Sequence, residues 1–121
     1  MFSFLSSVRS YLPLAIKGVT WDGDSLILYG HEWSFTTSSA WRVMRNNKLL
    51  FACWDDEVAA YLESLIGASV VEVAWLLNEQ PFDPSLVLSD NKKLDVFSSS
   101  SYEPWVLKLP GITYVGDFGG F

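Results

Sequence analysis

The sequence has little cysteine, histidine or positive charge, and each shortage argues against a class of function. One cysteine, Cys53, leaves no partner for an internal disulfide, which fits a reducing compartment. One histidine, His31, leaves no His/Cys cluster for a zinc site. Eight Lys and Arg stand against fourteen Asp and Glu and are scattered along the chain. We therefore expect no basic patch and no nucleic-acid binding.

Long apolar runs and phosphate loops are also missing. No stretch approaches the roughly 18–20 apolar residues that span a bilayer, and the start "MFSFLSSVRS" lacks the basic segment of a signal peptide. These absences predict a cytoplasmic protein without membrane contact. The glycines of "GDFGGF" (116–121) precede no helix, and "DGD" (22–24) is too short for a calcium loop. We expect no cofactor and no metal.

What the chain does contain indicates one domain, residues 1–121, with a substantial core. Half of its residues are hydrophobic and 16% are aromatic, six of them Trp. Its net charge of −6 favours basic partners and steered association, although it also serves plain solubility.

Two segments have helical periodicity. The first is a short amphipathic helix at Ser3–Leu12, a candidate dimerisation element. The second is Asp55–Ile66, with Asp55 as N-cap and Gly67 as the C′ residue. Its predicted apolar face consists of Val58, Tyr61, Leu62, Leu65 and Ile66.

The remaining segments are short β-rich runs joined by tight turns such as "DGD" (22–24) and "NN" (46–47), which predicts antiparallel meanders. "SLILYG" (25–30) matches "SLVLSD" (85–90), and "EWSFTTSSAW" (32–41) resembles "KLDVFSSSSYEPW" (93–105). We infer an internal duplication of about 14–53 and 65–118, against the alternative of chance similarity. The predicted fold is α+β, with about 8–10 short strands in two similar halves around the central helix.

The stretch "SSSSYEPW" (98–105) is hydroxyl-rich and has a counterpart, "TTSSAW" (36–41). Ser and Thr favour turns through local backbone hydrogen bonds, so both stretches read as strand connectors that place a Trp at a strand start. Tyr102 and Glu103 either tie down this loop or face a partner.

No catalytic group stands out. Cys53, His31 and Asp55 can be drawn together as a triad, but nothing in their spacing requires it, and inert buried cysteines are common. Turn chemistry explains Asp22 and Asp24, and helix capping explains 55–57. We therefore expect no enzyme, with a hydrolase built on Cys53 or on Asp and Glu carboxylates as the alternative.

Several patterns together resemble a known family: "L.G..V" (65–70), "D..L.LSD...LDVF" (83–97) and "SSYEPWVL" (100–107), with "AWRV" (40–43) and "WDDE" (54–57) earlier in the chain. Its members are small, poorly characterised bacterial domains similar to immunity proteins of polymorphic-toxin or contact-dependent growth inhibition systems. The resemblance covers residues 16–120 and implies a cognate toxin domain as the partner. It carries over no catalytic residue.

The leading hypothesis is an immunity protein that neutralises a toxin domain, such as a basic nuclease, by protein contact. The expected contact residues are all acidic: Asp55, Asp56, Glu57, Glu63, Asp22 and Asp24. A merely solvated face is the competing interpretation. The alternative function is a small-molecule or peptide-binding module, with an aromatic cleft lined by Trp33, Trp54 or Trp75.

Overall fold

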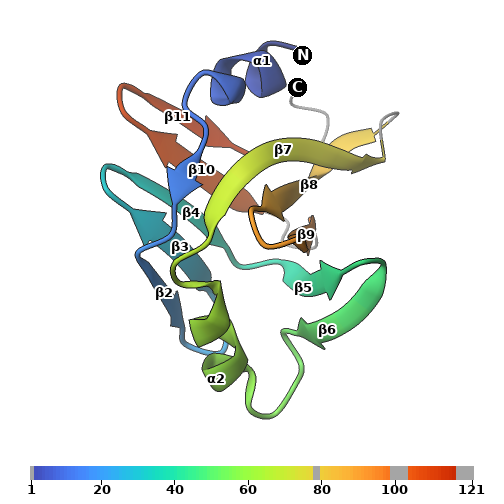
Figure 1. Ribbon diagram of the computed structural model, residues 1–121. Helices are drawn as coiled ribbons and strands as arrows, with labels where there is room; N and C mark the ends of the chain where they lie inside the picture. The colour runs from blue at the N-terminus through green and yellow to red at the C-terminus, as the bar shows by residue number, and fades with distance from the viewer. Residues whose placement is uncertain (1, 78–79, 99–103, 117–121) are drawn as a thin grey trace.

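The computed structural model describes residues 2–77, 80–98 and 104–116. It confirms the predicted α+β class: two antiparallel sheets face each other, and two short helices lie at their margins (Figure 1). No helix in the described part of the chain is long and apolar enough to cross a membrane.

The six-stranded sheet has the order β1-β7-β8-β9-β5-β6, and all of its pairings are antiparallel. Its strands are β1 (Leu14–Ala15), β7 (Ser69–Leu77), β8 (Gln80–Leu88), β9 (Lys92–Phe97), β5 (Ala40–Arg45) and β6 (Lys48–Ala52). The five-stranded sheet has the order β11-β10-β4-β3-β2. Its strands are β11 (Ile112–Val115), β10 (Trp105–Leu109), β4 (Trp33–Thr37), β3 (Leu26–Gly30) and β2 (Gly18–Trp21).

The core lies between the two sheets and follows the period-two alternation of the strands. Trp41 and Val43 on β5 are fully buried, whereas Arg42 and Met44 between and beside them are not. The opposite sheet contributes Leu26, Leu28, Phe35, Trp105 and Leu107 to the same cluster. Each such side chain contributes about 1.5–3 kcal/mol when it leaves water, so this face of each strand is strongly specified.

The two halves of the sequence exchange strands between the sheets. The first half supplies β2, β3 and β4 to the five-stranded sheet and the β5–β6 hairpin to the other. The second half supplies β7, β8 and β9 to the six-stranded sheet and the β10–β11 hairpin to the other. If β2 to β6 are matched in order with β7 to β11, the strand order of one sheet becomes that of the other, except for the additional strand β1. Duplication of a five-strand unit would produce this arrangement. The duplication itself stays a prediction.

The two loops that cross between the sheets meet at Pro104. Its carbonyl oxygen accepts hydrogen bonds from the hydroxyls of Thr37 (2.7 Å) and Ser39 (3.1 Å). Trp105 follows directly and is 1% exposed, so the connector does deliver its tryptophan into the core. Tyr102 and Glu103, whose role the sequence left open, lie outside the described residues.

The N-terminal helix α1 (Phe2–Arg9) is shorter than the predicted 3–12 segment. Phe4 and Val8 are buried in the core, and the Phe4 ring stacks on Trp75 at 5.1 Å and meets Tyr114 edge-on at 4.9 Å. The apolar face of α1 is therefore occupied within its own chain. A dimer through this helix stays a prediction, and it would have to use the opposite face.

The central helix is also shorter than predicted and begins later. It consists of α2 (Val58–Leu62) followed by the 3₁₀ turn η1 (Glu63–Leu65). The prediction of Asp55 as N-cap is wrong, because its carboxylate is bonded to Ala52 instead; Glu57 occupies the cap position without a side-chain bond. The predicted apolar face is only partly correct: Val58, Leu62 and Leu65 are buried, but Tyr61 and Ile66 are exposed.

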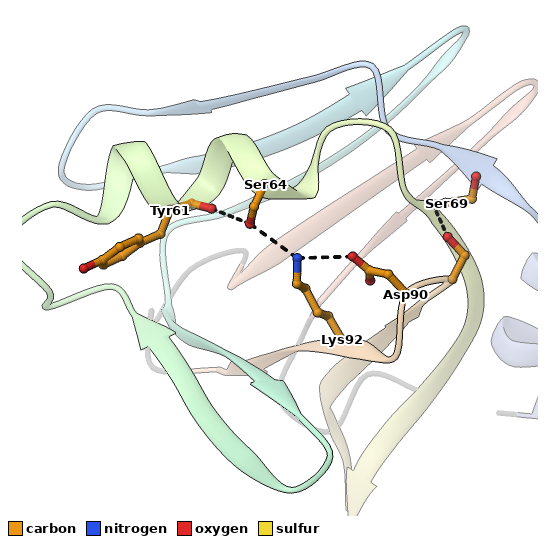
Figure 2. A network of polar contacts seen from close by, with 6 residues as sticks. Tyr61, Ser64, Ser69, Asp90 and Lys92 are labelled. Carbon is orange, nitrogen blue, oxygen red and sulfur yellow. Dashed lines mark hydrogen bonds and ion pairs between the residues drawn. The ribbon is translucent and has the colours of Figure 1, made fainter.

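A lysine attaches this helical segment to the six-stranded sheet. Lys92 is 9% exposed, and its Nζ lies 3.1 Å from Asp90 Oδ2 and 3.4 Å from Ser64 Oγ (Figure 2). The Ser64 hydroxyl in turn donates to the carbonyl of Tyr61 at 2.7 Å. The start of β9 and the 3₁₀ turn η1 are thus held together. The preceding helix α2 contacts β2 and β6, an edge strand of each sheet.

Candidate functional site

The segment between β6 and α2 forms a compact acidic turn. The Asp55 carboxylate accepts the Ala52 N–H at 2.8 Å, and the Asp55 N–H donates to the Ala52 carbonyl at 3.1 Å. These two hydrogen bonds close the turn at the end of strand β6. It leaves the next two carboxylates, Asp56 and Glu57, exposed to solvent.

Large apolar side chains are exposed around this turn. Trp54 is 67% exposed, Tyr61 49% and Leu50 45%. A shallow hollow is lined by Leu50 and Tyr61 together with Asp55, Asp56 and Glu57. We call these five residues and Trp54 the acidic surface. Exposed aromatic anchors beside charged groups are typical of protein-binding surfaces, because the anchors supply most of the binding energy.

The other predicted contact residues do not line the hollow. Glu63 is exposed in η1, at the far end of the helical segment. Asp22 and Asp24 are exposed on the turn after β2, a strand that α2 contacts. Asp22 Oδ1 accepts the N–H groups of Ser25 (2.7 Å) and Asp24 (2.9 Å), and these bonds lower the pKa of Asp22.

Two of the three tryptophans proposed for an aromatic cleft serve internal packing. Trp33 is 5% exposed, and its Nε1 donates to the carbonyl of Ala15 at 2.9 Å. Trp75 packs on Phe4 against the core. Trp54 alone of the three is largely exposed, and it belongs to the acidic surface. The structure therefore describes no cleft that these three side chains share.

The residues of the hypothetical triad have separate partners. His31 lies on the turn between β3 and β4, with Nε2 2.9 Å from Glu32 Oε2, and both side chains are well exposed. Cys53 is partly buried against the core, and the Asp55 carboxylate is bonded to Ala52. Within the described ranges, no three His, Cys, Asp or Glu side chains are grouped so that they could hold a metal ion.

The basic residues are scattered along the sequence, but strand pairing brings several of them onto neighbouring strands. Five of the eight lie on the adjacent strands β9, β5 and β6: Arg42, Arg45, Lys48, Lys92 and Lys93. The same three strands carry one acidic residue, Asp95. Sequence reasoning missed this grouping because Arg42 and Lys93 are fifty-one positions apart; strand pairing brings the two segments together.

Comparison of this chain with protein-family models, with curated proteins and with solved structures finds no match. The fold thus defines a small antiparallel α+β protein with two facing sheets.

Proposed function

We propose that this protein is an immunity protein, which binds a cognate bacterial toxin domain in the cytoplasm and blocks its activity. The observation that carries the proposal is the acidic surface, where Asp55, Asp56 and Glu57 surround a hollow beside exposed Trp54 and Tyr61. The resemblance of "LDVFSSSSYEPW" to immunity-type domains agrees with it.

The expected mechanism is occlusion, and it requires no reaction by this chain. A toxin that acts on nucleic acid needs basic groups for the phosphates, and Asp56 and Glu57 offer those groups a competing partner. The net charge of −6 would speed the encounter at low salt. Trp54 and Leu50 would then bury apolar area and slow dissociation, because desolvated aromatic anchors dominate interface energy.

The direct test is co-expression with the toxin domain encoded beside this gene. We expect growth to be rescued and the two proteins to elute together from a sizing column. The double reversal Asp56→Lys/Glu57→Lys should abolish both effects. Glu32→Lys, an exposed acid on the turn between β3 and β4, is the matched charge control.

Three results would contradict the proposal: no rescue by the native protein, no complex, or the same loss from Glu32→Lys as from the double reversal. A loss of rescue counts only if the variant keeps its cooperative urea transition. Asp56 and Glu57 are exposed, and their side chains make no hydrogen bond or ion pair with the described residues. Because they lie at the start of α2, their reversal should cost about 1–2 kcal/mol through the helix dipole and leave the protein folded.

Binding of a small molecule or peptide is the second candidate, and one observation favours it. Trp33 lines an open hollow together with Tyr11, His31, Lys17 and Pro110. A thermal-shift screen of aromatic and anionic ligands tests this function. If a ligand stabilises Lys17→Ala and His31→Ala as much as the native protein, it binds elsewhere, and this hollow is not its binding site.

A further inference from the structure

The outer face of the six-stranded sheet carries a buried carboxylate. Leu94 and Val96 on β9 face the core, so Asp95 between them points to the other face, away from the opposite sheet. Asp95 is nevertheless 1% exposed. Its Oδ1 accepts the Ser85 hydroxyl at 2.8 Å, and its Oδ2 lies 3.0 Å from Arg42 Nε. Both carboxylate oxygens therefore have partners on neighbouring strands.

Asp95 holds Arg42 in one orientation at the surface. The Arg42 guanidinium carbon also lies 5.0 Å from the centre of the Phe97 ring, so the group is both paired and stacked. The Arg42 side chain is 36% exposed. The bond to Asp95 is made by Nε. The terminal Nη1 and Nη2 groups have no hydrogen-bond partner in the described part of the chain. They form a fixed pair of donors of the kind that binds a carboxylate with two parallel bonds.

A second cation lies one row further along the same face. Arg42 pairs with Asp95, and two residues on, Met44 pairs with Lys93. Arg42 and Lys93 are therefore diagonal neighbours on adjacent strands, roughly 7–8 Å apart. Lys93 lines a hollow together with Met44, Val87 and three asparagines, Asn46, Asn47 and Asn91.

Stability alone does not account for a charge pair at this position. Replacing a buried ion pair by apolar residues of similar volume is often neutral or stabilising. A buried Asp95 beneath a half-exposed Arg42 instead restricts the arginine side chain before any partner arrives. This restriction reduces the conformational entropy that binding would otherwise cost.

We propose that the outer face of the six-stranded sheet binds an extended acidic protein segment. Its carboxylates would stand two residues apart, the first on Arg42 Nη1 and Nη2 and the second on Lys93 Nζ. The same-face repeat of an extended chain is roughly 7 Å, which is close to the diagonal spacing of the two cations. Asp95 is the positioning residue. This face shares no residue with the acidic surface, and the proposal does not rest on the immunity function.

Nucleic acid is the less favoured occupant of this face. Lys92 is already buried against Asp90 and is not available to a ligand. Few unpaired cations therefore remain, whereas nucleic-acid binding gains its affinity from many phosphate contacts.

The test uses two fluorescent peptides, one with alternating Glu and Val and one with Gln in place of each Glu. We expect the Glu peptide to bind in fluorescence anisotropy and the Gln peptide not to bind. Because a hydrogen bond to a charged group changes affinity roughly tenfold or more, Lys93→Gln and Arg42→Lys should each weaken binding by about that factor. Lys108→Gln, an exposed lysine on β10 of the other sheet, should leave the affinity unchanged.

The role of Asp95 has its own readout. In Asp95→Asn the arginine keeps its charge, so the weaker binding should come with faster solvent exchange of the Arg42 Nε proton, measured by NMR. Unchanged exchange with weakened binding would overturn the positioning role.

The proposal fails if both peptides bind equally, or if Lys93→Gln and Lys108→Gln bind the Glu peptide alike. It also fails if a single-stranded oligonucleotide binds this face more tightly than the Glu peptide. If Arg42→Lys does not fold, Lys93→Gln decides the question alone, because the hydrogen bonds of Asp95 in the described part of the chain are made by Arg42 and Ser85 and not by Lys93.

Discussion

Asp55 and Ala52 bond to each other twice across the turn that ends strand β6. The side chain of Asp55 accepts the Ala52 N–H at 2.8 Å, while its backbone N–H donates to the Ala52 carbonyl at 3.1 Å. Ala52 is fully buried. The residue that sequence reasoning assigned to a helix cap thus closes the edge of a sheet, and the two following carboxylates are held out toward solvent.

Asp55→Ala tests this arrangement. It leaves the buried Ala52 N–H without its acceptor, which should lower the free energy of unfolding by about 1–3 kcal/mol. Asp55→Asn keeps an acceptor oxygen and should lose less. Urea denaturation measures both, with exposed Asp56→Ala as control. Equal stability of Asp55→Ala and Asp56→Ala would contradict the assigned role.

Trp54 and Trp41 should behave in opposite ways when truncated. Trp54 is 67% exposed, so Trp54→Ala should change the free energy of unfolding by less than about 0.5 kcal/mol while weakening toxin binding. Trp41 is fully buried between Trp21 and Phe51, so Trp41→Ala should cost about 3–5 kcal/mol. Urea denaturation and co-elution with the toxin domain separate the two effects. Normal toxin binding by Trp54→Ala would contradict the role of Trp54 as an aromatic anchor of the acidic surface.

Phe4 should behave as a core residue, although it lies near the chain start. Its ring contacts Trp75, Trp105 and Tyr114 and is 1% exposed, so Phe4→Ala should lower the free energy of unfolding by about 3–5 kcal/mol. Ser6→Ala, on the exposed side of the same helix, is the control. A third variant, Ser6→Arg, tests the dimer hypothesis by sedimentation. A dimer built on the exposed face of α1 would be weakened by Ser6→Arg and unaffected by Ser6→Ala.

The Asp22 turn should make part of the stability depend on pH. Hydrogen bonds from the N–H groups of Ser25 and Asp24 favour the charged carboxylate and hold its pKa below the ordinary value of 3.8. The contribution is therefore complete above 3.8 and is lost as pH falls through the lowered pKa. NMR titration of the Asp22 carboxyl measures the pKa directly. In the native protein, acidification protonates the Asp22 carboxylate and removes its contribution to stability. Asp22→Ala has no such group, so its free energy of unfolding should fall less steeply between about pH 5 and pH 2. An unaltered slope would show that the turn contributes nothing.

Local pattern was enough to predict the class of fold, because alternation and turn chemistry act over a few residues. The "DGD" and "NN" turns both join antiparallel strands, β2–β3 and β5–β6, as predicted. The two-residue strand β1 was missed, since Leu14–Ala15 pairs with Val70 and Ser69 far along the chain. Strand β1 forms only because it pairs with β7, and two residues are too few to give a strand pattern in the sequence.

Boundaries and sites were less predictable because one side chain can serve competing structures. Asp55 had an N-cap signal, but the end of β6 offered its carboxylate a buried N–H, and the helix begins only at Val58. Tyr61 follows the helical period and is exposed because the core beside α2 is filled by Val58, Leu62 and Leu65. The exposed Tyr61 then became part of the acidic surface.

By itself, the sequence determined that this chain forms antiparallel sheets with a large aromatic core, since apolar alternation and composition require that burial. It also determined the net negative charge. Tertiary structure alone decided which charges meet: it joined β5 to β9 and placed Arg42 on Asp95. The physical reason is that strand pairing fixes neighbours by register across the sheet, and register depends on contacts between residues that are distant in the sequence.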